Sequence, residues 1–223
     1  MSETAARRLA HMFDAVSASL EVERDRLSEL DGAIGDGDHG TTMALGFQAV
    51  RSELSKLNLD DADISKVLNT AATAFINAVG ASTGPLYATG FRRAAKATEG
   101  RKNLDLATFA IIIEAIGVGI RERGHGQRGD KTMLDAWLPA AEAAQMAVSA
   151  NQSSAEFWNK VVAAATAGAN TTRSMIATKG RAARLRERSL GHMDPGAASA
   201  VIILQAMADG VGERMGWFSS RAG

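Results

Sequence analysis

The sequence predicts an all-α fold of about eight helices with no strand. Aromatic residues make up only 5% of the chain and there are three prolines, while alanine is abundant, which favours helices packed closely through small side chains. Apolar residues recur at helical spacing along nearly the whole chain, and polar, glycine-bearing turns separate them. Because no linker, repeat or low-complexity tract interrupts this pattern, we expect residues 1–223 to form one domain.

Apolar periodicity defines the first three expected helices. One covers about residues 5–30, and another follows the acidic turn that begins at Asp31. A third starts at Asp60, Asp61 or Asp63, because a carboxylate at a helix N-terminus complements the helix dipole. The residues expected to face inward are Leu9, Met12, Phe13, Val16, Leu20, Leu27, Leu30, Met43, Phe47, Val50, Leu54, Leu57, Ile64, Val67, Leu68, Ala71, Phe75, Ile76 and Val79.

Two local signals place the next two helices. Pro85 suits the first turn of a helix that runs to about Thr98. Asp105 is placed to cap the following helix. The apolar run at residues 111–113 also fits a buried strand by periodicity alone, but nothing nearby offers a partner strand, so we interpret it as helix.

Three further signals place the remaining helices. A helix over about residues 132–150 contains Pro139, which should kink or interrupt it. Residues 153–156 read Ser-x-x-Glu, a capping box that starts another helix. Asp194 as N-cap and Pro195 as first helical residue begin the last helix. On the helix that Asp105 caps, the residues expected to face inward are Phe109, Ile112, Ile113, Ile116 and Ile120. On the last two helices they are Trp158, Val161, Val162, Ala165, Val201, Ile202, Leu204, Met207 and Val211.

Composition excludes several classes of protein. The 25 Lys and Arg residues balance the 25 Asp and Glu residues, so no global charge favours nucleic acid or an anionic membrane as a partner. The absence of cysteine excludes a disulfide framework and leaves a reducing cytoplasm as the default location. No signal-peptide pattern and no apolar run of ~20 residues occurs. We therefore expect a soluble, cytoplasmic protein.

The most informative stretch is the acidic turn at residues 31–43, which holds three aspartates, four glycines, a histidine and two threonines. Carboxylates this close repel one another unless a cation lies among them, and hard cations such as Mg²⁺ or Ca²⁺ prefer oxygen ligands. The glycines expose backbone N–H groups, and a helix starting at Thr41 or Thr42 favours a phosphate. Together these features indicate a magnesium–nucleotide site.

Three other kinds of loop share features with this turn. A solvated turn has a similar composition. An EF-hand loop needs Gly at its sixth position and Glu at its twelfth. Counted from Asp36 these positions hold Thr41 and Phe47, and counted from Asp31 they hold Asp36 and Thr42, so an EF-hand is excluded. No Walker A pattern occurs.

Four polar turns recur between the apolar helices, at residues 31–42, 80–85, 124–133 and 180–196. In an up-and-down bundle alternate connections lie at the same end, so these turns can form one surface site. Carboxylates for a metal, amides and hydroxyls for phosphate, and an arginine for charge are what phosphoryl transfer requires. Met133 offers apolar surface to a base, with a core role as the alternative.

Four motifs occur in a fixed order along the chain. They read Asp31-x4-Asp36-Gly37-Asp38-His39-Gly40, Ser82-Thr83-Gly84-Pro85-Leu86-Tyr87, Gly129-Asp130-Lys131-Thr132-Met133-Leu134-Asp135-Ala136-Trp137-x-Pro139, and Gly180-Arg181-Ala182 with Glu187-Arg188-Ser189-x-Gly191-His192-x-Asp194-Pro195-Gly196. This set resembles the nucleotide-binding L subunit of dihydroxyacetone kinase and the C-terminal domain of single-chain, ATP-dependent dihydroxyacetone kinases. The resemblance covers about residues 9–211, which would be the core of the domain.

The resemblance implies an eight-helix antiparallel barrel with a nucleotide, ADP or ATP, and two Mg²⁺ ions at one end. It assigns the metal to Asp31, Asp36 and Asp38, and the catalytic charge to these residues together with Arg181. The implied nucleotide contacts are His39, Gly40, Thr41, Thr42, Ser82, Thr83, Gly124, Met133, Arg181, Asp194, Pro195 and Gly196. The sugar would be held by a separate K subunit.

Three positions depart from the family pattern. Family members often have Asn in place of Thr42, and an aromatic and a small residue in place of Arg184 and Arg186. These arginines are open to contact with the K subunit, a phosphoryl donor protein or a charged substrate, or they are surface variation. The identity of the ketose therefore stays open, and a tetrulose is one candidate. The phosphoryl donor also stays open, because it can be free ATP or a phosphotransferase-system protein that recharges bound ADP. A homodimeric state is a further open alternative.

Three classes of function remain on the sequence alone. The first is the phosphoryl-transfer subunit of a ketose kinase. The second is a nucleotide-binding regulatory or protein-docking module without catalysis, and the third is a kinase of another substrate, such as a fatty acid.

Overall fold

The structure is a computed structural model that describes residues 3–80 and 82–212, with side chains placed up to residue 210. Within these residues it contains α-helices and short 3₁₀ segments and no strand, so the all-α prediction is confirmed. The elements are α1 (Ala5–Val22), α2 (Arg24–Ile34), α3 (His39–Leu54), α4 (Ile64–Ala78), α5 (Thr83–Ala97), α6 (Leu106–Gly124), α7 (Leu134–Ser149), α8 (Ser154–Thr171), η1 (Thr172–Ser174), η2 (Ala182–Ser189) and α9 (Pro195–Gly212).

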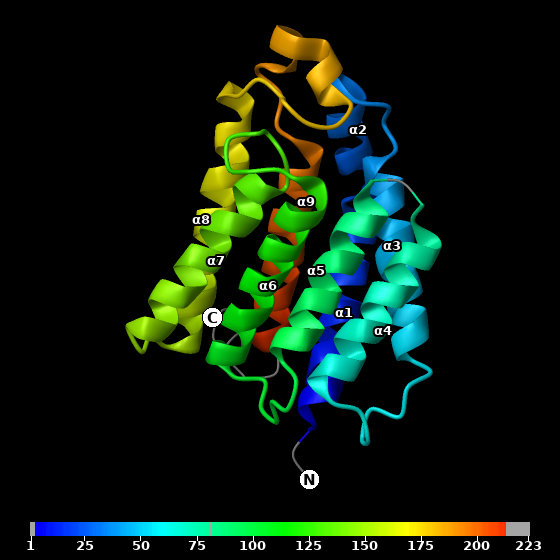
Figure 1. The fold of residues 1–223 in the computed structure, drawn as a ribbon, viewed down its shortest axis with the longest axis vertical. Coiled ribbons are helices and arrows are strands. Elements are labelled where there is room, and N and C mark those ends of the chain that lie inside the picture. The colour runs from blue at the N-terminus through cyan, green and yellow to red at the C-terminus, as the bar shows by residue number, and fades with distance from the viewer. Residues whose placement is uncertain (1–2, 81, 213–223) are drawn as a thin grey trace, which may run out of the picture.

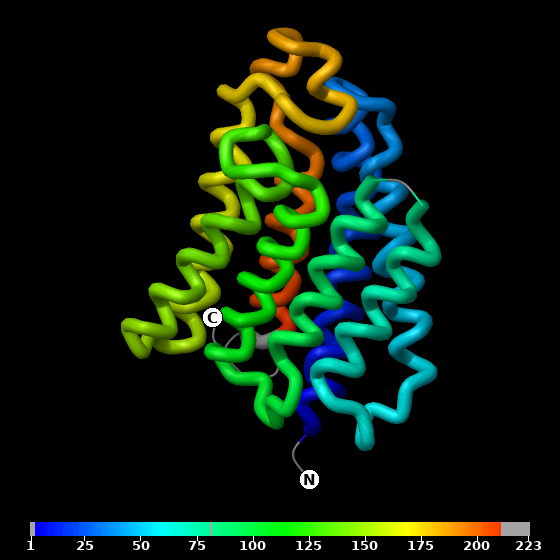
Figure 2. Tube along the Cα trace, viewed as in Figure 1, coloured from blue at the N-terminus to red at the C-terminus, as the bar shows by residue number. Residues whose placement is uncertain are grey.

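The long helices run alternately up and down and lie side by side (Figures 1 and 2). Helices α3 to α9 each pack against the next in order, α1 packs against α3, and α9 packs against α1. Figure 1 shows the consequence for the connections. The turns that follow α2, α4, α6 and α8 all lie towards the upper end, as alternation requires. No described helix combines the length and the apolar character needed to cross a membrane.

An aromatic cluster fills the centre between α3, α4 and α5. The ring centroids of Phe47 and Phe75 are 5.2 Å apart, those of Phe75 and Tyr87 5.4 Å, and those of Tyr87 and Phe91 5.9 Å. Edge-to-face and tilted pairs of this kind are favourable beyond the area they bury. Every residue that the sequence predicts to face inward is buried or partly buried, except Val211, whose side chain lies outside the described part.

The first predicted helix is divided, which corrects the expected run over residues 5–30. The N–H of Glu23 binds the carbonyls of Ser19 and Glu21, and α2 then starts afresh at Arg24. Helix α2 continues to Ile34, whose side chain is fully buried, so Asp31 lies in the last turn of a helix and not in a loop. The described residues therefore hold nine α-helices where about eight were expected.

Helix α3 also begins earlier than expected, at His39 instead of Thr41 or Thr42. The loop between α2 and α3 therefore consists only of residues 35–38. Hydrogen bonding explains the early start, because the first turn of α3 closes with the N–H of Thr42 on the carbonyl of Asp38, 2.9 Å away.

Helix α7 passes through Pro139 without interruption, so of the two expected effects, a kink or an interruption, the interruption does not occur. Proline cannot donate to the carbonyl four residues earlier, which here belongs to Asp135. Gly168 of α8 lies against that carbonyl so closely that a Cβ added there would be 1.8 Å from the oxygen. The close approach of α8 covers the carbonyl that Pro139 leaves without a helical partner.

Four predicted helix starts are confirmed by capping hydrogen bonds. The carboxylate of Asp63, the last of the three candidates, accepts from the N–H of Lys66. Asp105 caps α6, Ser153 forms the capping box of α8, and Asp194 accepts from the third residue of α9 at 2.7 Å. Capping signals were readable because donor and acceptor lie within one turn of each other.

Candidate functional site

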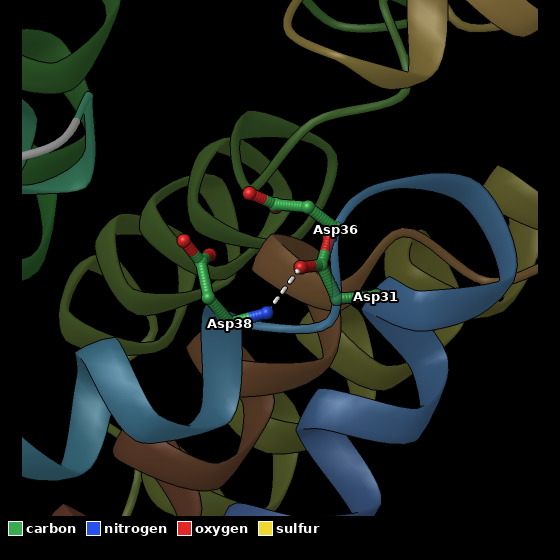
Figure 3. A group of neighbouring side chains, drawn as sticks. All are labelled: Asp31, Asp36 and Asp38. Carbon is green, nitrogen blue, oxygen red and sulfur yellow. Dashed lines mark hydrogen bonds between the residues drawn. The ribbon is translucent and has the colours of Figure 1, made fainter.

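The three carboxylates of the acidic turn come together at the upper end of the molecule. Asp31 lies in the last turn of α2, Asp36 in the connecting loop and Asp38 directly before α3 (Figure 3). One oxygen from each lies within 4.8 Å of the others. Three negative charges this close favour a cation between them, and an all-oxygen donor set suits Mg²⁺. The residues present therefore fit the metal that the sequence indicates.

Backbone amides fix the orientation of the central carboxylate. Oδ2 of Asp31 accepts from the N–H of Asp38 at 3.0 Å and from the N–H of His39 at 3.3 Å. Two glycines make this loop possible. A Cβ at Gly35 would lie 2.2 Å from Oδ1 of Asp31, and Gly37 has φ +78°, which side chains rarely adopt. The loop geometry thus requires both glycines of the Gly-Asp-Gly-Asp sequence.

Arg181 reaches this cluster from the segment between α8 and α9. Its guanidinium forms an ion pair with Asp36, and its Nη1 lies 3.4 Å from Oδ2 of Asp38. The hydrogen bond to Asp36 and the charges of both carboxylates raise the pKa of Arg181. A permanent positive charge therefore lies at the exposed edge of the acidic cluster.

A cavity of about 430 Å³ opens beside the carboxylates. Helices α2, α3, α5, α6, α7 and α9 and the segment before α9 all contribute to its walls. The predicted site residues that line it are Asp31, Asp36, His39, Ser82, Thr83, Gly124, Met133, Arg181, Asp194, Pro195 and Gly196. The structure thus brings residues from all four predicted turns to one place.

Three predicted nucleotide contacts lie outside the cavity walls. Gly40 is buried against α2, where an added Cβ would lie 1.9 Å from the carbonyl oxygen of Arg24. Thr41 is exposed, and Thr42 is half-buried in the first turn of α3. In the structure, the small size of Gly40 lets α2 and α3 approach each other.

The two ends of the bundle differ in how their helices are capped. At the lower end α1, α4, α6 and α8 begin, and each has a side-chain cap, from Thr4, Asp63, Asp105 and Ser153. At the upper end Asp194 caps α9, but α3, α5 and α7 have N-cap residues whose side chains make no capping hydrogen bond. Unsatisfied first-turn N–H groups and the positive end of a helix dipole attract anions.

Helix α5 is the clearest case of an uncapped start at the cavity. The first N–H of α3 is bound by Asp31, and that of α7 by the hydroxyl of Thr132. Among the described residues, no side chain accepts from the first-turn N–H groups of α5. Ser82 and Thr83 at this position also line the cavity and add two hydroxyl donors. The start of α5 therefore offers a set of donors to a phosphate.

Two titratable groups, the buried His39 and the half-buried Asp194, line the same cavity. His39 Nε2 lies 2.9 Å from the hydroxyl of Ser199, and burial lowers the pKa of His39, which favours its neutral form. Asp194 is half-buried, and its Oδ2 caps α9. Burial, with smaller contributions from the charges of Asp135 and Asp31, raises the pKa of Asp194 to about 7.

Three charged residues to which the sequence motifs assign no role shape the turn after α6. Asp130 accepts from the N–H of Gln127 at 2.8 Å, and Asp135 accepts from the N–H of Thr132 at 2.8 Å. Lys131 is only 1% exposed. The signal was present in the sequence as charged residues embedded among glycines, but their partners are backbone groups that a sequence does not mark.

Comparison with known proteins agrees with this geometry. Residues 33–209 match the DAK2 domain family. The chain belongs to that family. It is 36% identical over 197 residues to the ADP-binding subunit DhaL of the PEP-dependent dihydroxyacetone kinase 2 of Listeria innocua, covering 88% of this chain and 91% of the relative. The corresponding Escherichia coli subunit is 38% identical over 189 residues, covering 85% and 89%.

Longer relatives carry a DAK2-like region as one part. The D-erythrulose kinase of Mycolicibacterium smegmatis is 31% identical over 92% of this chain but only 35% of its own length. The crystal structure of the dihydroxyacetone kinase from C. freundii in complex with AMP-PNP and Mg²⁺ superposes with a TM-score of 0.69 and 27% identity. It covers 94% of this chain and 35% of that one. The resemblance to the dihydroxyacetone kinase L subunit is confirmed.

Proposed function

We propose that this chain is the Mg–ADP/ATP-binding phosphoryl-transfer subunit of a dihydroxyacetone kinase or of a kinase of a related ketose such as a tetrulose. One observation carries the proposal. The cluster of Asp31, Asp36 and Asp38 adjoins a cavity of about 430 Å³ whose other walls supply hydrogen-bond donors for a phosphate. The ADP-binding subunits among its DAK2 relatives support this assignment.

The carboxylates are the proposed metal ligands. Asp31, Asp36 and Asp38 offer six oxygens between them, enough to hold a pair of Mg²⁺ ions with nucleotide oxygens completing the coordination. Bound magnesium would neutralise the charge that develops on the transferring phosphoryl group. Asp31, held by two backbone N–H groups, keeps one carboxylate oriented before any ligand arrives.

Different walls of the cavity would bind different parts of the nucleotide. Ser82, Thr83 and the first N–H groups of α5 would bind phosphate oxygens, as an uncapped helix start allows. Met133 packs against Gly196, with 3.4 Å from its Cβ to the position a glycine Cβ would take, and with Gly124 would border the base. Arg181 would neutralise the transferring group from the open side.

The remaining implied nucleotide contacts would act either from outside the cavity walls or at their edges. Gly40, Thr41 and Thr42 would contribute through the start of α3, whose dipole points at the carboxylate cluster, and not through the cavity surface. His39, neutral and bound to Ser199, would present a ring nitrogen or an apolar edge to the nucleotide. Asp194, Pro195 and Gly196 would close the far wall.

The sugar would be bound by a separate K subunit, and the phosphoryl donor would be a phosphotransferase-system protein or free ATP. Arg184, Arg186 and Arg188 are exposed beside Arg181 and form no ion pair with described residues. Such a surface suits an acidic partner surface. We further propose one functional domain over residues 1–223, acting in the cytoplasm, without nucleic acid or membrane as a partner; a homodimer is compatible with it.

Isothermal titration with Mg–ADP and Mg–ATP tests the binding step. Wild type should bind, and Asp36→Asn should weaken binding at least about 10-fold, as expected for loss of a charge-assisted ligand. Asp25→Asn, on the exposed face of α2, removes an equal charge away from the cavity and should bind as wild type.

A second assay tests transfer. With a K subunit and dihydroxyacetone present, loaded protein should deliver the phosphoryl group to the ketose. Binding without transfer to any ketose would leave the regulatory module as the better description. Equal binding by wild type and Asp36→Asn would contradict the metal assignment.

A further inference from the structure

The ammonium group of Lys131 is enclosed by backbone carbonyls. Its Nζ donates to the carbonyl oxygens of Thr172 at 2.8 Å, Met175 at 3.2 Å, Ser189 at 2.6 Å and His192 at 2.6 Å. An ammonium has three N–H donors, so at least two of these four contacts share one. No carboxylate of the described residues pairs with Lys131. Its positive charge is therefore stabilised by the dipoles of main-chain carbonyls.

All four carbonyls belong to one stretch, which we call the capping segment, residues 172–192. This stretch has only short 3₁₀ helices and carries Arg181 near its middle. Two further hydrogen bonds tie it to the turn after α6, since the hydroxyl of Thr178 donates to the carboxylate of Asp130 at 2.7 Å and its N–H to the Asp130 carbonyl at 3.2 Å. Lys131 and Asp130 thus hold the segment from one side.

The capping segment has few ordinary means of staying in place. Within it, the N–H of Gly191 binds the carbonyl of Arg173 at 2.8 Å, and the N–H of Ala177 binds the hydroxyl of Ser189 at 3.0 Å. Of the carbonyls that bind Lys131, only that of Thr172 also accepts a described backbone N–H. Unpaired buried carbonyls are costly, so the ammonium replaces the hydrogen bonds that a regular element would supply.

The backbone of Lys131 is held in an uncommon conformation. Its φ is +59°, in the left-handed region that residues other than glycine rarely enter. Such a conformation persists where surrounding contacts over-determine it, and it is found at sites where a side chain must be aimed. Here it turns the side chain away from α7 and into the ring of carbonyls.

We infer that Lys131 is a positioning residue that fixes the capping segment over the cavity and thereby keeps Arg181 at Asp36 and Asp38. It acts through the main chain of the segment and not by contact with a phosphate. The effect on phosphoryl transfer rests on the proposed function, whereas the effect on the segment itself does not.

Trypsin gives a test that needs no nucleotide, because the capping segment contains its own cleavage sites at Arg173, Lys179, Arg181, Arg184, Arg186 and Arg188. In Lys131→Met, which keeps the apolar stem, cleavage inside the segment should be roughly 10- to 100-fold faster than in wild type, since hydrogen bonds of a charged group are lost. Cleavage after Lys56 and Arg101, outside the segment, should be unchanged. Lys160→Met, an exposed charge on α8, is the control and should match wild type.

A double-mutant cycle tests the route through Arg181. If Lys131 acts by placing Arg181, Lys131→Met should reduce phosphoryl transfer about as much as Arg181→Met, and the double variant should lose little more. Additive losses would overturn this route, and unchanged cleavage of the capping segment in Lys131→Met would overturn the positioning role. The cleavage assay needs no nucleotide, so it tests the positioning role even if the chain binds none. Failure of the proposed function and failure of the positioning role are therefore distinguishable.

Discussion

Arg181 approaches Asp38 to within 3.4 Å although 143 residues separate them in the chain. The contact joins the segment before α9 to the start of α3, so the charge balance of the acidic cluster depends on the closed arrangement of the whole bundle. A guanidinium at the exposed edge of three carboxylates is also placed to meet a phosphate brought in with the metal.

Replacement of Arg181 by Met should therefore affect transfer more than binding. The turnover rate should fall roughly 10²- to 10³-fold, the range for loss of one preorganised charge at the reacting group, while the affinity for Mg–ADP changes much less. Single-turnover kinetics with isothermal titration separates the two. Equal losses in both would assign Arg181 to ground-state binding alone.

The stability of the protein should fall as the pH rises from about 4 to about 7 because of Asp194. The pKa of this carboxyl is raised to about 7 in the folded state, above the ~4 of an unfolded chain. Between these values the folded state holds a proton that the unfolded state has released, so raising the pH favours unfolding by about 1.4 kcal/mol per unit for this group. Above pH ~7 the dependence levels off.

Asp194→Asn removes this titration and keeps an oxygen that can accept from the N–H of Ala197. Urea midpoints of the metal-free protein at pH 5, 6, 7 and 8 should therefore decline more steeply for wild type than for Asp194→Asn. Parallel curves would show that another group governs the pH dependence.

Gly168 should tolerate no side chain. A Cβ there would lie 1.8 Å from the carbonyl of Asp135, so Gly168→Ala forces α8 away from α7 and should cost about 1–3 kcal/mol of unfolding free energy. Gly117→Ala, in the interior of α6 with its nearest neighbour at 3.6 Å, is the matched control and should be neutral or stabilising by up to ~1 kcal/mol. Urea unfolding measures both, and equal effects would contradict the close approach.

The sequence predicted those parts of the fold that local signals determine. The caps at Asp63, Asp105 and Asp194 and the clustering of the three carboxylates of the acidic turn depend on residues within one or two turns. The unbroken passage through Pro139 depends on a residue far away in the chain, Gly168, which packs against the carbonyl of Asp135. The break at Glu23 was likewise not marked by the apolar spacing. Periodicity alone does not contain that information.

The site shows the same division. Side chains at the four turns could be assigned because metal and phosphate chemistry needs particular residue types. Lys131 could not, because its partners are carbonyl oxygens 41 to 61 residues away. Gly40 was assigned to the nucleotide, whereas its lack of a side chain first serves the approach of α2 to α3.

Binding of a magnesium–nucleotide complex by the three carboxylates and the cavity underlies every proposal made for this chain. It can be measured by native mass spectrometry of the protein in magnesium, before and after addition of ADP, ATP and a chelator. We expect a mass increase of one nucleotide with magnesium that the chelator removes, and a much lower loaded fraction for Asp36→Asn. If the protein acquires no nucleotide under these conditions, or if Asp36→Asn acquires it equally, the site does not bind the complex through these carboxylates.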